Sequence, residues 1–378
     1  MDSSRNALMK VAILGGGSHS AVGRAHVSAI RLLGNVSIEA GCFSKDPQKN
    51  QISGESYGVS SGRIHPNLKT LIEAEENNLS TVIVLTPTQS HFGDVKTILE
   101  AGLNVICEKS LCGTAKDAST LVSIAEANNV KLFVTFNYTG YPMVREIRDR
   151  VQKGNIGRIH TINAVMPQEG FLKKTLENEP IVPQDWRLVD SEIPTVSLDL
   201  GVHLVNLVAF TTGLKFRELI AVESKRGNFD VIDDVHVISK MNNSAICNLW
   251  YSKTSLGRRN GLGFELYGDQ GSIVWNQESP EEFVFSDKFG NINLVNRGTQ
   301  GLSIANSQRY LRFKPGHPSG FIEAFANYYE DVFSEIESQG EPNQEYVFGG
   351  ADACEGLLAM EAISKSSAVG EWTQINVN

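Results

Sequence analysis

The sequence has 378 residues, which is more than one compact core usually holds, so we expect two domains. The formal net charge is −9 at pH 7, and the sequence lacks the basic face that nucleic-acid-binding proteins present. The five cysteines are scattered and odd in number, which favours reduced thiols in a cytoplasmic protein over a disulfide framework or a metal site. Apolar runs are only as long as strands and Met1–Lys10 is polar, so neither a membrane span nor a signal peptide is expected.

The first part of the chain alternates short apolar runs with helical patterns. Strands are expected at residues 10–14, 36–43, 80–86, 103–107 and 131–136, and helices at 23–33, 90–101 and 114–128. Strands that are apolar on both faces and alternate with helices are typical of a doubly wound parallel sheet. Residues 1–138 are therefore predicted to form an α/β domain of the Rossmann type.

The rest of the chain, residues 139–378, follows a different pattern. Strands succeed one another, and helices frame them. The strands are expected at 158–165, 218–224, 233–241, 244–251, 263–268 and 271–276, and the helices at 143–153, 197–212, 317–338 and 349–367. Strands in series predict a second α/β domain with a large open, mostly antiparallel sheet and helices on one side.

A glycine-rich loop follows the first expected strand. Gly15-x-Gly17 lies between that strand and a helix, where glycine lets the backbone approach a pyrophosphate that the helix N-terminus attracts. Ser20 occupies the third glycine position of the usual fingerprint, and Gly23 takes the helix-packing role across a longer loop. A plain tight turn is the alternative, but the position between strand and helix favours dinucleotide binding.

The end of the second strand bears on the choice of cofactor. A carboxylate at this place favours NAD, whereas a small polar residue beside a basic one admits the 2′-phosphate of NADP. Ser44 and Lys45 favour NADP, and Asp46 keeps NAD open, so both cofactors remain candidates.

Two further strand ends carry candidate residues, because ligands of doubly wound sheets collect at the carboxyl ends of the strands. Thr86-Pro87 is expected to line the cofactor, with His91 as a residue of the helix start rather than a catalyst. Lys109 follows Glu108 at the end of another strand, where an ammonium group can stabilise a developing alkoxide. The alternative is a solvated surface lysine.

Asp199 and His203 are four residues apart in a segment predicted to be helical, so their side chains share one face. A carboxylate beside an imidazole orients the ring and stabilises its protonated form, which makes a general base for neutral pH. The alternative is a structural hydrogen bond near a helix end.

These motifs together resemble the glucose–fructose oxidoreductase/inositol dehydrogenase (Gfo/Idh/MocA) family over nearly the whole chain. The matching features are the glycine loop with Gly23 and His26, Thr86-Pro87, Glu108-Lys109, Asn137-Tyr138 with Pro142, residues 153–159, and Asp199-x-Gly201-x-His203. The lengthened glycine loop and residues 316–327 resemble the branch that holds sugar 3-dehydrogenases such as levoglucosan dehydrogenase.

The resemblance implies an NAD(P)-dependent oxidoreductase that moves a hydride between nicotinamide and a secondary hydroxyl or keto group of a sugar or cyclitol. It also implies a homodimer or homotetramer formed through the open sheet. The implied catalytic residues are Lys109, Asp199 and His203. The implied cofactor contacts are Gly15, Gly17, Ser18, His19, Val22, Ser44, Lys45, Thr86, Pro87, His91, Glu108, Lys109 and Asn137. The implied substrate contacts are Lys109, Tyr138, Trp186, Arg187, Asp199, His203 and His317.

Two positions depart from the family pattern. Ser110 stands where proline usually follows the lysine and would fix the backbone, and Asn206 stands where an aspartate is frequent. Two other functions are kept as alternatives, a nucleotide-sugar dehydrogenase or ketoreductase and a non-catalytic sensor that binds the cofactor. The presence of both Lys109 and His203 argues against the sensor.

Overall fold

The structure is a computed structural model that describes residues 8–338 and 345–375, and it divides into two compact units. The first unit runs to Cys112 and also includes Lys116–Gly140 and Phe321–Cys354. The second unit consists of Gly113–Ala115, Tyr141–Gly320 and the chain from Glu355 onward. Among the described residues, no helix combines the length and the hydropathy needed to cross a membrane.

The first unit is built on a five-stranded parallel sheet, as the sequence predicted. Its strands are β1 (Met9–Gly15), β2 (Val36–Cys42), β3 (Thr81–Leu85), β4 (Asn104–Glu108) and β5 (Leu132–Thr135), in the order β2-β1-β3-β4-β5. The chain leaves β1 toward β2 on one side and later returns to β3 on the other. Ligands of such sheets bind at this change of direction, outside the carboxyl ends of the strands.

Helices connect these strands. They are α1 (Ala21–Leu33), α2 (Pro47–Ser56), α3 (Leu68–Glu75), α4 (Thr88–Glu100) and α5 (Ala115–Ala127). Helices α2 and α3 were not predicted from the sequence. Helix α2 has almost no apolar periodicity, but it begins with two ordinary start signals, the side-chain cap of Asp46 and a proline at its first position.

Helix α8 (Phe321–Glu337) belongs to the first unit, although its residues were predicted to lie in the second domain. It packs against α1, because the ring of His26 lies 4.7 Å from that of Phe325 and its Nδ1 is 2.6 Å from the Tyr329 hydroxyl. The helix begins four residues later than predicted, after Pro318 and Gly320.

The second unit contains a nine-stranded sheet in the order β13-β12-β11-β10-β6-β9-β8-β7-β14. The strands are β6 (Ile159–Pro167), β7 (Phe216–Ser224), β8 (Asp234–Met241), β9 (Ile246–Ser252), β10 (Gly263–Gly268), β11 (Gly271–Asn276), β12 (Glu282–Asp287), β13 (Ile292–Asn296) and β14 (Thr373–Gln374). All pairs are antiparallel apart from β6 and β9, which confirms the prediction of a mostly antiparallel sheet. Strands β12 to β14 were not predicted.

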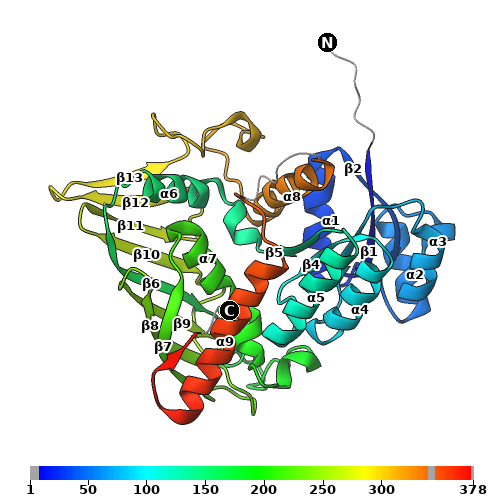
Figure 1. The fold of residues 1–378 in the computed structure, drawn as a ribbon, viewed down its shortest axis with the longest axis horizontal. Helices are drawn as coiled ribbons and strands as arrows, with labels where there is room; N and C mark the ends of the chain where they lie inside the picture. Colours follow the sequence, from blue (N-terminus) through cyan, green and yellow to red (C-terminus); the bar gives the residue numbers. More distant parts are fainter. Residues whose placement is uncertain (1–7, 339–344, 376–378) are drawn as a thin grey trace. The chain divides into compact units, whose positions relative to one another are not determined.

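Helices α6 (Pro142–Gln152) and α7 (Val202–Thr212) lie on one face of this sheet (Figure 1). Helix α9 (Gly350–Val369) follows the last long loop, and its residues from Glu355 onward belong to the second unit. Along β8 the side chains alternate between buried and half-buried or exposed, which is the pattern of a sheet with one covered face.

Candidate active site

The glycine loop of the first unit has a backbone that only glycine adopts without strain. Gly15 and Gly16 have φ angles of +83° and +62°, and a Cβ on Gly15 would lie 2.8 Å from the backbone of Leu85. A Cβ on Gly23 would lie 1.8 Å from the carbonyl oxygen of Gly16, so α1 approaches the loop more closely than any side chain permits. The helix-packing role predicted for Gly23 is confirmed.

The N-terminus of α1 opens beside this loop. Ser20 caps the helix, because its side chain accepts a hydrogen bond from the backbone N–H of Gly23. Ser18 is tied to α2 through its N–H, which donates to Ser53 Oγ at 3.0 Å. His19 and Val22 are exposed at the helix start. A glycine loop and a capped helix N-terminus fit a bound pyrophosphate.

At the end of β2, Ser44 and Lys45, which favour NADP, make different contacts from Asp46, which favours NAD. Lys45 is exposed, and the half-buried Ser44 accepts a hydrogen bond from the backbone N–H of Asp46. The Asp46 carboxylate caps α2 by accepting the backbone N–H of Lys49 at 3.0 Å. This carboxylate therefore has a structural partner already, whereas Lys45 places an exposed cation at the end of β2.

His91 joins the loops that follow β3 and β4. Its Nε2 lies 2.6 Å from the carbonyl oxygen of Thr86, and its Nδ1 lies 2.8 Å from that of Ser110. Burial lowers the pKa of His91, and the two carbonyl contacts act in the opposite direction. Both ring nitrogens face the protein, while Pro87 at the start of α4 is exposed. The buried Ser110 thus has its backbone held, although the proline typical of the family is missing.

Lys109 stands at the end of β4, and the residue before it belongs to a buried network. The Glu108 carboxylate lies 3.1 Å from His26 Nε2 and accepts a hydrogen bond from Thr135 Oγ1 at 2.5 Å. Burial acts to raise the pKa of Glu108, but the hydrogen bond and charge of His26, the charge of Lys109 and the Thr135 hydroxyl together lower it to about 2. Glu108 is thus an anion in the protein, and its side chain is turned toward α1. The peptide bond between Lys109 and Ser110 is cis.

Asn137 and Tyr138 follow β5 in a short 3₁₀ turn, and both are buried. Within the described part of the chain, no hydrogen-bond acceptor is in reach of the buried amide nitrogen Nδ2 of Asn137. Buried amide groups are nearly always paired. An unpaired amide on the segment that follows β5, together with the glycine loop, fits a bound dinucleotide.

Asp199 and His203 lie on consecutive parts of one helical segment in the second unit. Residues Ser197–Gly201 form a π-helical turn that continues directly into α7, rather than the single α-helix that was predicted. Such turns are frequent at functional sites. Gly201 between them is a packing residue, since a Cβ there would lie 2.7 Å from Met360 Sδ and 3.0 Å from the ring of Tyr251.

Two cations share one oxygen of the Asp199 carboxylate. Lys253 Nζ lies 2.5 Å from Asp199 Oδ2, and Arg187 donates to the same oxygen. The Arg187 guanidinium also lies over the ring of Trp186, 4.3 Å from its centroid. His203 is buried, with 5% of its surface exposed. The second unit therefore brings together three predicted residues, Arg187, Trp186 and Asp199, and adds Lys253.

His317, the remaining predicted contact, is exposed in the second unit, with its ring edge-on to Phe313 at 4.4 Å. Its carbonyl oxygen accepts a hydrogen bond from Arg297. Asn206 lies further along α7 and is half-buried. Among the described residues, no group of three His, Cys, Asp or Glu side chains is arranged to hold a metal ion.

A parallel sheet with a strained glycine loop, a capped helix start and an unpaired amide defines the first unit as a nucleotide-binding Rossmann fold. Residues 9–136 match the model of an oxidoreductase family with an NAD-binding Rossmann fold, and residues 144–274 match a GFO/IDH/MocA C-terminal domain. The chain belongs to the Gfo/Idh/MocA family of NAD-binding oxidoreductases.

Relatives of known sequence and structure cover nearly all of the chain. An uncharacterized oxidoreductase of Bacillus subtilis, YfiI, is 28% identical and covers 97% of this chain and 96% of its own. Levoglucosan dehydrogenase of Pseudarthrobacter phenanthrenivorans is 24% identical over 80% of this chain and 81% of its own. The inositol dehydrogenase homolog of Azotobacter vinelandii, solved with NADH and myo-inositol, is 26% identical, covers 98% of each chain and superposes with a TM-score of 0.85.

Proposed function

We propose that this protein transfers a hydride between C4 of a nicotinamide and a secondary carbinol of a sugar or cyclitol. The observation that carries the proposal is the charged cluster around Asp199, which lies one helical turn before the buried His203 in a chain of this family. Relatives named levoglucosan dehydrogenase and myo-inositol 2-dehydrogenase support a polyol substrate.

Each proposed catalytic residue has one task. His203 takes the hydroxyl proton, and the Asp199 carboxylate stabilises the imidazolium that forms. Lys109 stabilises the negative charge that develops on the substrate oxygen. NAD or NADP supplies the hydride acceptor when it is bound. General-base assistance of this kind contributes about 10²–10⁴-fold to the rate.

The proposed binding residues are divided between the two units. In the first unit, we assign the cofactor to the glycine loop, Ser44-Lys45, Thr86-Pro87, the strand end at Lys109 and Asn137. In the second unit, Trp186 offers an aromatic face on which a sugar ring can stack, and Arg187 offers hydrogen-bond donors for hydroxyl groups. Tyr138 and His317 complete the proposed substrate contacts.

A panel of sugars and cyclitols with NAD⁺ or NADP⁺, followed at the absorbance of the reduced nicotinamide, tests this function. We expect reduction with at least one polyol, levoglucosan and myo-inositol being the first to try. Reduction with no polyol, together with tight cofactor binding, would contradict the proposal and favour the sensor. Activity with a nucleoside-diphosphate sugar alone would instead favour the nucleotide-sugar dehydrogenase.

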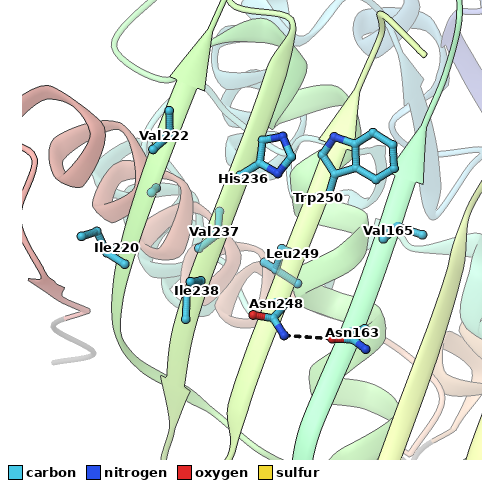
Figure 2. A pocket seen from close by; sticks show the side chains of 11 residues that line it. Asn163, Val165, Ile220, Val222, His236, Val237, Ile238, Asn248, Leu249 and Trp250 are labelled. Atoms are coloured by element: carbon cyan, nitrogen blue, oxygen red, sulfur yellow. Dashed lines mark hydrogen bonds between the residues drawn. The ribbon is translucent and has the colours of Figure 1, made fainter. Parts of the chain in front are cut away.

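We further propose that the protein forms a homodimer or homotetramer through the open face of the nine-stranded sheet. Figure 2 shows this face, with the helices of the second unit behind the sheet. Ile238 and Val222 are 46% and 58% exposed, and the ring of Trp250 stacks on that of His236. Asn163 and Asn248 form a hydrogen bond in the same depression. A largely apolar face with a few polar groups suits a self-complementary contact between two copies.

Light scattering of the purified protein tests this contact. Ile238→Lys should convert the oligomer to a monomer, because it places one charge per copy in the contact. Leu176→Lys is the matched control, since Leu176 is a fully exposed leucine in a loop and its replacement should leave the mass unchanged. An unmodified protein that is monomeric at micromolar concentration would contradict the proposal.

We also propose a cytoplasmic location. All five cysteines are free thiols, and Cys42, Cys107, Cys112 and Cys247 are buried. Free thiols persist in reducing compartments, where disulfides are rare.

A further inference from the structure

Lys253 is a buried lysine directly after β9, and it is not among the site residues predicted from the sequence. Its side chain is 4% exposed, and its ammonium nitrogen lies 2.5 Å from Asp199 Oδ2. The ring of Phe171 also lies near the ammonium group, with 5.3 Å between the nitrogen and the ring centroid. The charge of this lysine is therefore directed at the carboxylate that we assign to the catalytic centre.

Burial distinguishes this pair from other lysine–carboxylate pairs of the second unit. Lys215, Lys225 and Lys240 also pair with carboxylates, and their side chains are 58%, 48% and 49% exposed. Removing an ammonium group from water is unfavourable, and a close partner of opposite charge offsets this penalty. The charge of the buried Lys253 is offset by Asp199, a carboxylate that we assign to the site.

The backbone holds Lys253 in a fixed position. Its N–H donates to the carbonyl oxygen of Asp233 at 2.8 Å, and its own carbonyl oxygen accepts the N–H of Phe171 at 2.8 Å. Asp199, in contrast, lies on a π-helical turn, whose geometry departs from that of the helix that follows. An anchored cation thus fixes a carboxylate whose own helical turn is irregular.

We propose that Lys253 is a positioning residue of the dehydrogenase centre, which holds the Asp199 carboxylate as an anion in the orientation that His203 requires. The inference rests on the proposed function. Lys253 and Arg187 both bind Oδ2, so the carboxylate has a defined rotation rather than a mobile one. Lys253 acts through Asp199, and we assign it no contact with the substrate.

A double-mutant cycle tests this role, because residues that act through each other give effects that do not multiply. Lys253→Met should lower kcat by at least about tenfold while changing the Kd of the cofactor by less than about twofold. Asp199→Asn should lower kcat by about 10²-fold or more, and adding Lys253→Met to it should cost little further. Lys215→Met, which removes an exposed paired lysine of the same unit, is the matched control and should leave kcat unchanged.

The outcomes separate this inference from the proposed function. If the unmodified protein oxidises no polyol, the proposed function fails and the inference fails with it. If the unmodified protein is active but Lys253→Met retains full kcat, only the inference is overturned. The same holds if the effects of Lys253→Met and Asp199→Asn on kcat multiply in the double variant. Should Lys253→Met not fold, Lys253→Arg and Lys253→Gln decide: the charged variant should exceed the neutral one by about tenfold in kcat, and equal rates would overturn the role of the charge.

Discussion

Glu108 and His26 form a buried pair, with 3.1 Å between Glu108 Oε1 and His26 Nε2, immediately before the proposed catalytic Lys109. The other ring nitrogen of His26 lies 2.6 Å from the hydroxyl of Tyr329 on α8. One imidazole thus links strand β4 to two helices. The end of β4 is positioned by a helix that follows it by more than two hundred residues in the chain.

Acid should weaken the fold through Glu108. The pKa of this carboxyl is about 2 in the folded protein, below its ordinary value of 4.5, so its contribution to stability is present above about pH 4.5 and is lost as the pH falls toward 2. The shift corresponds to about 3 kcal/mol of unfolding free energy at most. Urea unfolding between pH 6 and pH 3 should show a steeper loss of stability for the unmodified protein than for Glu108→Gln. Equal slopes would contradict the assignment. Part of the slope will remain in the variant, because Arg63 also lowers the pKa of Glu75.

Lys109→Met should lower kcat by at least about 10²-fold, because the developing alkoxide loses the cation proposed to stabilise it. The Kd of the cofactor, measured by quenching of protein fluorescence, should change little. Lys96→Met is a suitable control, since Lys96 is a partly exposed lysine on α4 that pairs with Glu100. Full turnover in Lys109→Met would remove this lysine from the mechanism.

Lys45 should determine how strongly the protein prefers NADP⁺, through contact with its 2′-phosphate. Lys45→Glu is expected to raise the KM for NADP⁺ by about tenfold or more, which corresponds to about 1.4 kcal/mol, and to change the KM for NAD⁺ far less. Asp46→Asn should leave the ratio of the two KM values unchanged, because its carboxylate caps α2. A parallel change for both cofactors after Lys45→Glu would show that Lys45 does not contact the adenosine ribose.

Gly23→Ala should destabilise the first unit and abolish cofactor binding. The added methyl group would lie 1.8 Å from the carbonyl oxygen of Gly16, and the backbone must move to admit it. We expect a loss of at least about 2 kcal/mol in unfolding free energy. Gly93→Ala on α4 is the matched control, because nothing lies within 4 Å of its Cβ and alanine favours a helix by up to about 1 kcal/mol. A stable Gly23→Ala protein with unchanged cofactor affinity would contradict the close approach.

The sequence predicted the elements whose residues are apolar in a regular pattern. The strands at the centre of both sheets are of this kind, and so are α1 and α7. Strands β12 and β13 lie next to and at one edge of the sheet, and they escaped prediction because most of their residues are exposed or half-exposed and resemble loops. The placement of α8 could not be read from the sequence either, since it depends on contacts of His26 with Phe325 and Tyr329 far along the chain.

The candidate site was predictable in its local motifs and not in its long-range partners. Asp199 and His203 are neighbours along a helix, so their spacing was visible in the sequence. Lys253 directly follows β9 and is 54 residues away from Asp199 in the chain, so only the folded protein brings them together. Gly16 was also missed, although it lies within a run of three glycines and its positive φ angle requires glycine.

The ring of His91 contacts both the loop after β3 and the loop after β4. One imidazole contacts the carbonyl oxygens of Thr86 and Ser110, so the positions of the two loops depend on the same ring. We expect a ligand that binds against Thr86-Pro87 to shift the backbone beside Lys109 as well, because both loops contact this imidazole.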